Sequence, residues 1–181
     1  DLHSFPTRRS SDLIQYQLGA LMAFTAARGV KLQHCKPHGS LYNMAAKDMD
    51  LSLAIAEAIV EVDKNIILMG LAGSKMLEAG RQMGLRVASE VFADRAYQAD
   101  GSLVPRKQPG AVIHDKDEAI ARTIRMVTEG KVTAITGEEV SIDAHSICVH
   151  GDNPSAVEFV KNIRASLSAQ GVEIAPIAEI V

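Results

Sequence analysis

The feature that most constrains this chain is the alternation of short apolar runs with longer segments of helical periodicity. Apolar runs at residues 65–69, 85–91 and 146–150 have the length and composition of buried strands. Helical segments lie between them, and two begin with N-cap signals, at Asp48 and at Asp115. Strands that alternate with amphipathic helices form βαβ units, whose strands are parallel. The sequence therefore predicts an α/β fold with a parallel sheet.

Composition and charge exclude several classes of function. The chain has 181 residues, 47% hydrophobic and 23% charged, with a formal net charge of -3. This balance is typical of a globular domain and gives no basic surface for nucleic acid or anionic membrane. No apolar run reaches the ~20 residues that cross a bilayer. Cys35 and Cys148 lie far apart without a C-x-x-C motif, which indicates reduced thiols and a cytoplasmic location.

The first thirteen residues differ from the rest. Residues 1–13 (DLHSFPTRRSSDL) show neither helical nor strand periodicity and lack the apolar core of a signal peptide. A natural flexible tail is one explanation, and we favour a non-native tail. We expect residues 14–181 to form a single α/β domain. Within it, residues 92–114 form a long segment without sustained period, and such loops are often functional or mobile.

Polar side chains gather at the carboxyl ends of three predicted strands. The clusters lie at residues 36–43, 89–95 and 149–152. In parallel α/β folds, ligands bind at the carboxyl ends of the strands. We therefore expect the three clusters to meet at one edge of the sheet and to form the active site.

Each cluster has a chemical and a structural interpretation. His38 lies between proline and glycine, so it is either a turn residue or an acid–base group, and Lys36 offers a cation for a carboxylate or phosphoryl oxygen. Asp94 and Arg95 are either site residues or surface ions that pair elsewhere. Glu90 interrupts an apolar strand, and a buried carboxylate needs partners such as Arg95.

The last cluster and the segment before it add further candidates. Arg106 is a second possible partner for Glu90. His150 is the better catalytic candidate of its cluster, whereas Asp152 or Asn153 is expected to cap the following helix. No H-E-x-x-H or comparable spacing is present, so the sequence gives no metal ligands.

Five blocks in this order resemble the LamB/YcsF family: KPHGSLYN, GLAGS, RVASEVFADRAYQADGSLVPR, QPGAVIHD and ICVHGDNP. The resemblance runs from about Ile14 to the end of the chain. It implies a distorted (β/α) barrel of the polysaccharide-deacetylase-like type, lacking its first strands. It also implies an ATP-dependent 5-oxoprolinase, a cyclic amide hydrolase that converts 5-oxo-L-proline (pyroglutamate) to L-glutamate with partner subunits B and C.

The implied chemistry assigns roles to the candidate residues. ATP as co-substrate would phosphorylate the lactam oxygen and create a better electrophile for water. The site then needs cations for the substrate carboxylate and the developing oxyanion, and a base for water. The expected catalytic residues are Lys36, His38, Asp94, Arg95 and His150. The expected substrate-binding residues are Tyr42, Asn43, Glu90, Arg106 and Asp152.

The chain also departs from the family pattern. The family's D-L-N-x-D-x-G-E-like, C-G-F-H-A-G-D and G-A-H-P blocks do not occur here. A (β/α) barrel typically needs ~250 residues, so we expect the first third to be missing and this chain alone to be inactive. The missing Asp and His residues would be the candidates for a divalent metal, which the residues present do not support. Two alternatives stay open: a non-catalytic lactam-binding accessory subunit, and, by fold analogy, a metal-dependent deacetylase-like hydrolase.

Overall fold

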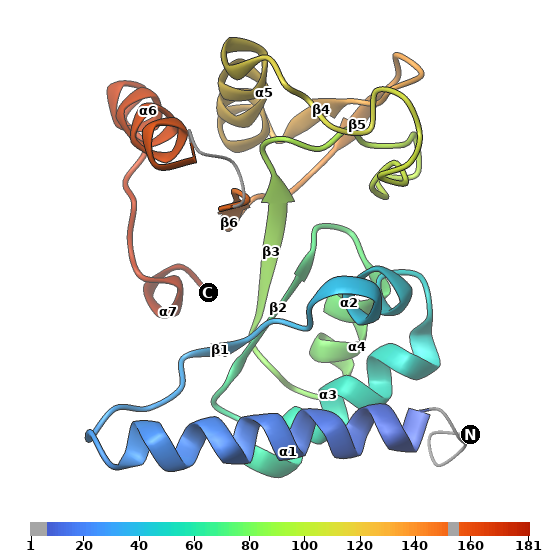
Figure 1. Cartoon of the computed structure of the whole chain (residues 1–181), viewed down its shortest axis with the longest axis vertical. Helices are drawn as coiled ribbons and strands as arrows, with labels where there is room; N and C mark the ends of the chain where they lie inside the picture. The colour runs from blue at the N-terminus through green and yellow to red at the C-terminus, as the bar shows by residue number, and fades with distance from the viewer. Residues whose placement is uncertain (1–6, 152–155) are drawn as a thin grey trace. The chain divides into compact units, whose positions relative to one another are not determined.

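Helices and parallel strands alternate in the computed structural model, which describes residues 7–151 and 156–181 (Figure 1). The elements in chain order are α1 (Thr7–Ala26), β1 (His34–Cys35), α2 (Gly39–Ala45), α3 (Met49–Asp63), β2 (Ile67–Leu71), α4 (Lys75–Gln82), β3 (Val87–Phe92), α5 (Lys116–Thr128), β4 (Lys131–Thr133), β5 (Glu139–Ser141), β6 (Ser146–Cys148), α6 (Ala156–Ala169) and α7 (Ile177–Ile180). A four-stranded sheet has the order β1-β2-β3-β6, and β4 pairs antiparallel with β5. The pairs β1–β2 and β3–β6 are parallel, as the sequence predicted.

The chain divides into two compact units, residues 1–89 with Val181 and residues 90–180. The single-domain boundary at 14–181 stays a prediction. Within residues 7–151 and 156–181, the structure has no helix that is both long and apolar enough to span a membrane. Residues 1–6 of the expected non-native tail lie outside the described residues.

In the first unit, α3 packs against α1 and α4 (Figure 1). The predicted cap of α3 is confirmed, because the carboxylate of Asp48 accepts a hydrogen bond from the backbone N–H of Leu51 at 3.1 Å. Helix α1 buries Ile14 and Leu18. It begins at Thr7, so residues 7–13 are helical although they lack helical periodicity. Strand β2 is buried along its whole length, as expected for a strand covered on both faces.

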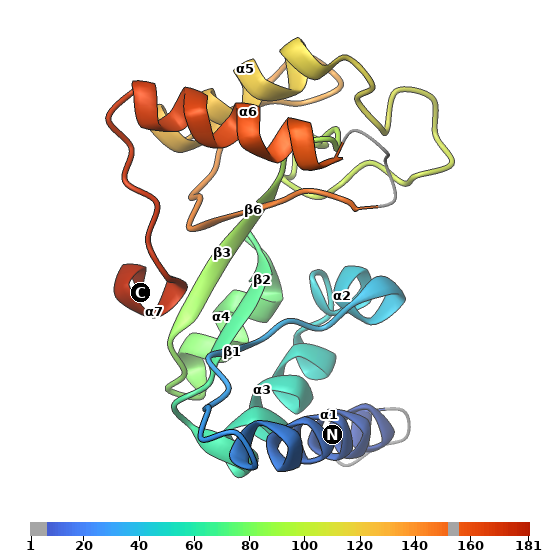
Figure 2. The same cartoon turned by 60° about the vertical axis from the view of Figure 1, so that its left-hand side comes forward.

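In the second unit, α5 and α6 pack side by side (Figure 2). The predicted cap of α5 is confirmed, because the Asp115 carboxylate accepts from the N–H of Glu118 at 2.9 Å. Helix α6 buries Phe159, Ile163 and Leu167. Val157 of the same helix is 70% exposed. The last segment contains the short helix α7.

The segment from Ala93 to His114, which links β3 to α5, is folded on itself. Isolated antiparallel bridges join Arg95 to Val112 and Tyr97 to Leu103. Backbone hydrogen bonds tie Ala96 to both Ala111 and Val104, each at 3.0 Å. The side chains of Ala96, Val104 and Ala111 form a small buried core. This long segment therefore has a defined backbone path beyond the carboxyl end of β3.

Candidate active site

The register of β3 and β6 brings two predicted catalytic residues together. Phe92 and Cys148 are paired at the carboxyl ends of these adjacent parallel strands. Asp94 and His150 each follow two residues later, so they leave the sheet at the same edge. Residues at the carboxyl ends of neighbouring parallel strands are placed for ligand binding and catalysis. Strand pairing thus brings together Asp94 and His150, which are 56 residues apart in the sequence.

Asp94, His150 and Arg106 form a hydrogen-bonded chain. Nδ1 of His150 lies 2.8 Å from Oδ2 and 3.1 Å from Oδ1 of Asp94. Nε2 of His150 lies 2.7 Å from Nη2 of Arg106. A guanidinium has only donors, so Nε2 must be the acceptor of that bond. The proton of the neutral imidazole then resides on Nδ1 and is donated to Asp94.

This tautomer is the one that a general base requires. The carboxylate of Asp94 orients the ring and stabilises the imidazolium that forms when Nε2 takes a proton. The side chains of both residues are 23% exposed, so Nε2 can meet a ligand or water from solution. The arrangement can therefore accept a proton at Nε2, provided that Arg106 moves away from that atom.

Two aromatic residues support the histidine. The ring of Phe92 stacks on His150 with a centroid separation of 6.0 Å and an interplanar angle of 29°. The backbone N–H of Phe92 donates to the hydroxyl of Tyr97 at 2.9 Å. Burial is the largest cause that raises the pKa of Tyr97 well above its ordinary value, so this hydroxyl stays neutral. The predicted cluster at residues 89–95 contains Phe92, but the sequence predicted no role for either aromatic residue.

Arg95, which directly follows Asp94 in the sequence, is buried. It is only 5% exposed, and its Nε donates to the carbonyl oxygen of Ala111 at 3.2 Å. Its Nη2 donates to the carbonyl oxygen of Val104 at 2.5 Å. Burial, followed by the nearby charge of Arg106, lowers the pKa of Arg95 from its ordinary value. The guanidinium of Arg95 is thus directed into the 93–112 segment.

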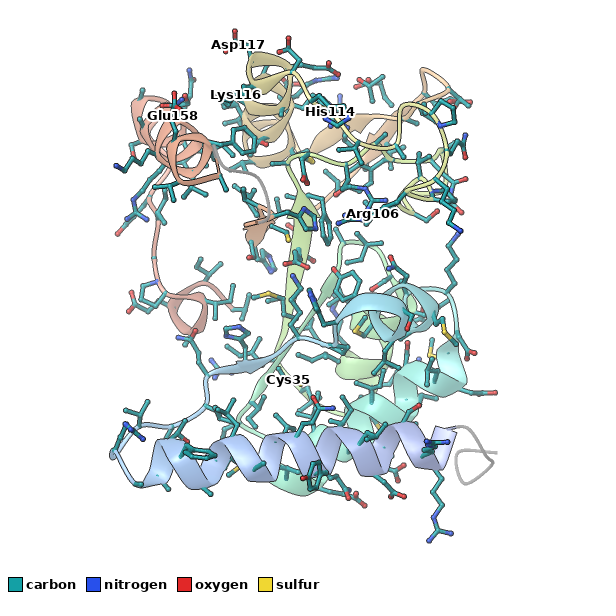
Figure 3. All side chains as sticks on the ribbon, in the orientation of Figure 1. Cys35, Arg106, His114, Lys116, Asp117 and Glu158 are labelled. Carbon is teal, nitrogen blue, oxygen red and sulfur yellow. The ribbon has the colours of Figure 1, made fainter. Side chains whose placement is uncertain are left out.

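Glu90 and Arg106 occupy contrasting environments. Glu90 is 2% exposed within β3, opposite Ser146 of β6, so the expected burial of this carboxylate is confirmed. Arg106 is exposed and lies on the segment after β3, where it is labelled in Figure 3. Its Nη2 is bonded to His150. An exposed guanidinium beside a potential base is well placed to bind an anionic ligand.

The predicted site residues of the first unit surround the start of α2. His38 is the exposed N-cap residue of this helix. The ammonium of Lys36 lies 5.6 Å from the centre of the Tyr42 ring, a cation–π contact, and Tyr42 is 4% exposed. The side-chain amide of Asn43 donates to the carbonyl oxygen of Gly39 at 3.0 Å within the helix. Their predicted roles in catalysis and substrate binding stay predictions.

Asp152, the remaining predicted residue, lies outside the described residues. In the described parts of the chain, no group of three or more His, Cys, Asp or Glu side chains is arranged to hold a metal ion. Both cysteines are free thiols, as expected; Cys35 is buried and Cys148 is half-buried.

A profile of the LamB/YcsF family matches residues 4–181. The chain belongs to the LamB/YcsF family. It is 63% identical over 161 residues to the 5-oxoprolinase A subunit of Alkaliphilus metalliredigens, covering 89% of this chain. It is 52% identical over 173 residues to the 5-oxoprolinase A subunit of Clostridium beijerinckii, covering 96% of this chain. These matches span 63% and 68% of the two relatives, so the chain has about two-thirds of their length.

A solved structure supports the fold. The crystal structure of a lactam utilization protein from Thermus thermophilus matches with a TM-score of 0.83 and 43% identity, over 91% of this chain and 66% of that one. The predicted fold class, α/β with a parallel sheet of the distorted-barrel type, is confirmed by this match. The family resemblance inferred from the five sequence blocks is confirmed as well.

Proposed function

We propose that this chain acts as a component of an ATP-dependent 5-oxoprolinase that hydrolyses 5-oxo-L-proline to L-glutamate together with partner subunits B and C. The relatives at 52–63% identity are named as the A subunit of 5-oxoprolinase, and the structural relative is named for lactam utilization. The observation that carries a catalytic role is the Asp94–His150 pair, whose Nε2 has the lone pair of a general base. A cytoplasmic location is part of the same proposal.

The proposed base acts on water. ATP would supply a phosphoryl group to the lactam oxygen and make the ring carbon more electrophilic. Nε2 of His150 then takes a proton as water adds to that carbon, and Asp94 stabilises the imidazolium. The C–N bond breaks as the ring nitrogen receives a proton from His150, which leaves an acyl phosphate. A second water releases phosphate, so the sum is 5-oxoproline, ATP and two waters giving glutamate, ADP and phosphate.

Arg106 links substrate binding to exposure of the base. In the structure its guanidinium donates to Nε2, which blocks the position that an attacking water would take. A carboxylate or phosphoryl oxygen is a stronger acceptor for a guanidinium than a neutral imidazole. The anionic substrate would therefore draw Arg106 away from Nε2 and open this position. Such an order of events restricts proton transfer to the liganded site.

The other predicted residues complete the proposal. Lys36 and His38 stay proposed catalytic residues, and Tyr42, Asn43, Glu90 and Asp152 stay proposed substrate-binding residues.

The test is the release of glutamate from 5-oxoproline with ATP and subunits B and C. This chain is compared with a version extended by the part of the Alkaliphilus relative that it does not match. Activity only in the extended protein would support both the proposed reaction and the expected inactivity of this chain alone. Activity in neither protein would contradict the proposed substrate.

The matched variants His150→Gln and His145→Gln separate a catalytic role from an accessory one. His145 is also paired with an aspartate, Asp143, at 3.2 Å, and Asp143 is 68% exposed. Loss of turnover in H150Q alone, with 5-oxoproline binding retained, supports catalysis by this chain. Full turnover in H150Q would favour the non-catalytic accessory role. Activity on an acetylated sugar without ATP, abolished by a chelator, would favour the deacetylase alternative.

A further inference from the structure

Arg95 has surroundings that differ from those of a substrate-binding cation. Its side chain is 5% exposed, and both of its hydrogen-bond acceptors, the carbonyl oxygens of Ala111 and Val104, belong to the backbone. A buried guanidinium gains less from neutral carbonyls than from a carboxylate. The burial of Arg95 therefore indicates that the fixed directions of its N–H donors, rather than its charge, explain its role in the site.

The two carbonyl groups lie on either side of Arg106 along the chain. Val104 precedes it and Ala111 follows it, and both are buried in the small core of the segment. The planar guanidinium presents several donors in a fixed fork, so one side chain can bind both backbone positions at once. Arg95 thereby closes the base of the turn from which Arg106 extends toward His150.

The backbone of Arg95 is itself held in place. Its carbonyl oxygen accepts a hydrogen bond from Nη1 of Arg122 at 3.3 Å, and its backbone bridges to Val112. Arg95 also directly follows Asp94, the partner of His150 Nδ1. Arg95 thus connects helix α5 with Asp94 and Arg106, the two hydrogen-bond partners of His150.

The charge of Arg106 is close enough to act on Arg95. It is the second cause, after burial, that lowers the pKa of Arg95, whereas the carboxylate of Asp94 raises it. The like charges of the two guanidinium groups favour their separation, and the bonds of Arg95 to Val104 and Ala111 oppose it.

We propose that Arg95 is a positioning residue, which ties Val104 to Ala111 and so holds Arg106 in contact with Nε2 of His150. Its effect on turnover rests on the proposed function. Its effect on the hydrogen bond of His150 does not, because that bond exists in the chain by itself. This assignment replaces the direct catalytic role that the sequence suggested for Arg95.

The experiment compares ¹⁵N-histidine NMR spectra of this chain with those of Arg95→Met, Arg95→Gln and Arg106→Gln. The His150 resonances are identified by their absence in H150Q. R106Q provides the spectrum of a His150 ring without its Nε2 donor. We expect R95M to shift the Nε2 resonance toward the R106Q position while the Nδ1 proton stays bonded to Asp94. Arg125→Met is the matched control, because Arg125 also bonds side chains of the second unit, Glu129 among them.

Each outcome decides the proposal. A folded R95M or R95Q whose His150 resonances equal those of the unmodified chain would overturn it. Unfolding of both variants, seen by circular dichroism, would overturn it too, because Arg95 would then be required for the fold itself. A shift of equal size in R125M would show that the resonance reports general loosening, which also removes the support for a specific role.

Turnover gives a second, separable readout. In the extended protein with subunits B and C, R95M should lower kcat/KM for 5-oxoproline by up to about tenfold and by no more than R106Q does, because it misplaces the guanidinium that R106Q removes. R95M combined with R106Q should be no worse than R106Q alone, since both changes remove the same contact. If the unmodified protein lacks 5-oxoprolinase activity, the proposed function fails while the NMR result still decides the role of Arg95.

Discussion

His150 and Asp94 extend from the ends of two adjacent parallel strands, and Nδ1 of the histidine lies 2.8 Å from Oδ2 of the aspartate. The contact follows from the register, in which Phe92 of β3 is opposite Cys148 of β6. Because Arg106 donates to Nε2, the imidazole proton is on Nδ1, and the pair can accept a second proton at Nε2 once Arg106 moves away. Substitutions on either side of the imidazole should therefore change turnover in different ways.

Asp94→Asn should reduce 5-oxoproline turnover by roughly 10²–10⁴-fold, the usual contribution of an oriented base. An amide cannot stabilise the imidazolium, and its NH₂ group competes for Nδ1. The measurement is kcat for glutamate release by the extended protein with subunits B and C. Asp143→Asn, which changes the exposed partner of His145, is the control and should retain full activity. Equal losses in both variants would contradict the specific role of Asp94.

Arg106→Gln should raise KM for 5-oxoproline by about tenfold or more, since hydrogen bonds to charged groups contribute roughly 1.5–3 kcal/mol. Arg106→Lys keeps the charge without the planar fork, so it should have an intermediate KM. Lys107→Gln removes the neighbouring exposed cation and serves as the control. An unchanged KM in R106Q would rule out Arg106 as the contact for the substrate anion.

The buried thiol of Cys35 should make stability depend on pH above 9. Burial raises the pKa of Cys35 from 9.0 to about 11. The folded state thus keeps a proton that the unfolded state loses, so this stabilisation is complete below pH 9.0 and is lost as pH rises toward 11. The effect reaches up to about 3 kcal/mol.

Urea unfolding of this chain at several pH values measures the Cys35 effect. Between pH 9 and 11, the free energy of unfolding should fall less steeply with pH in Cys35→Ala than in the unmodified chain. The slopes are compared rather than the absolute stabilities, because alanine also leaves a cavity. Identical slopes would mean that the thiol is not shielded from water.

Two glycines in helices should respond to alanine with opposite signs. A Cβ atom at Gly80 of α4 would lie 2.7 Å from Cγ1 of Val87 and 3.0 Å from Cδ2 of Leu68. Valine has little rotamer freedom, so Gly80→Ala should lower the free energy of unfolding by about 1–3 kcal/mol. At Gly19 of α1, nothing lies within 4 Å of an added Cβ atom. Gly19→Ala should therefore raise the free energy of unfolding by up to about 1 kcal/mol.

Urea denaturation of the two glycine variants checks these signs. Stabilisation by G80A would show that β3 or the end of β2 moves aside to make room. Destabilisation by G19A would show that the exposed side of α1 at this position is in contact with something else in solution.

Local patterns in the sequence were sufficient for much of the fold. The caps of α3 and α5 were predicted because Asp48 and Asp115 bond backbone groups only three residues away. Apolar runs gave the positions of β2 and β3 to within a few residues. The helix α2 was not predicted, because seven residues that begin with glycine carry almost no periodic signal.

Packing against elements far apart in the sequence determined where α1 begins and which face of α6 is buried, and local sequence patterns did not predict either. Residues 7–13 are helical without periodicity, since α1 packs along α3, and the side chain of Gln15 donates to Glu61. In α6, Val157 is exposed whereas Phe159 is buried, because the position of α5 selects which face of the helix is covered. Apolar residues occur on both faces, so the sequence alone did not identify the packed one.

For the candidate site, the sequence by itself determined which residue types stand at the strand ends: a carboxylate at Asp94, a base at His150 and cations at Arg95 and Arg106. The tertiary structure alone decided which of them meet and what each can do. Strand register placed Asp94 against His150, and the folding of the 93–112 segment placed one arginine on Nε2 and buried the other under backbone carbonyls. The physical reason is that hydrogen bonds depend on distances of about 3 Å between residues far apart in sequence, which no local pattern fixes.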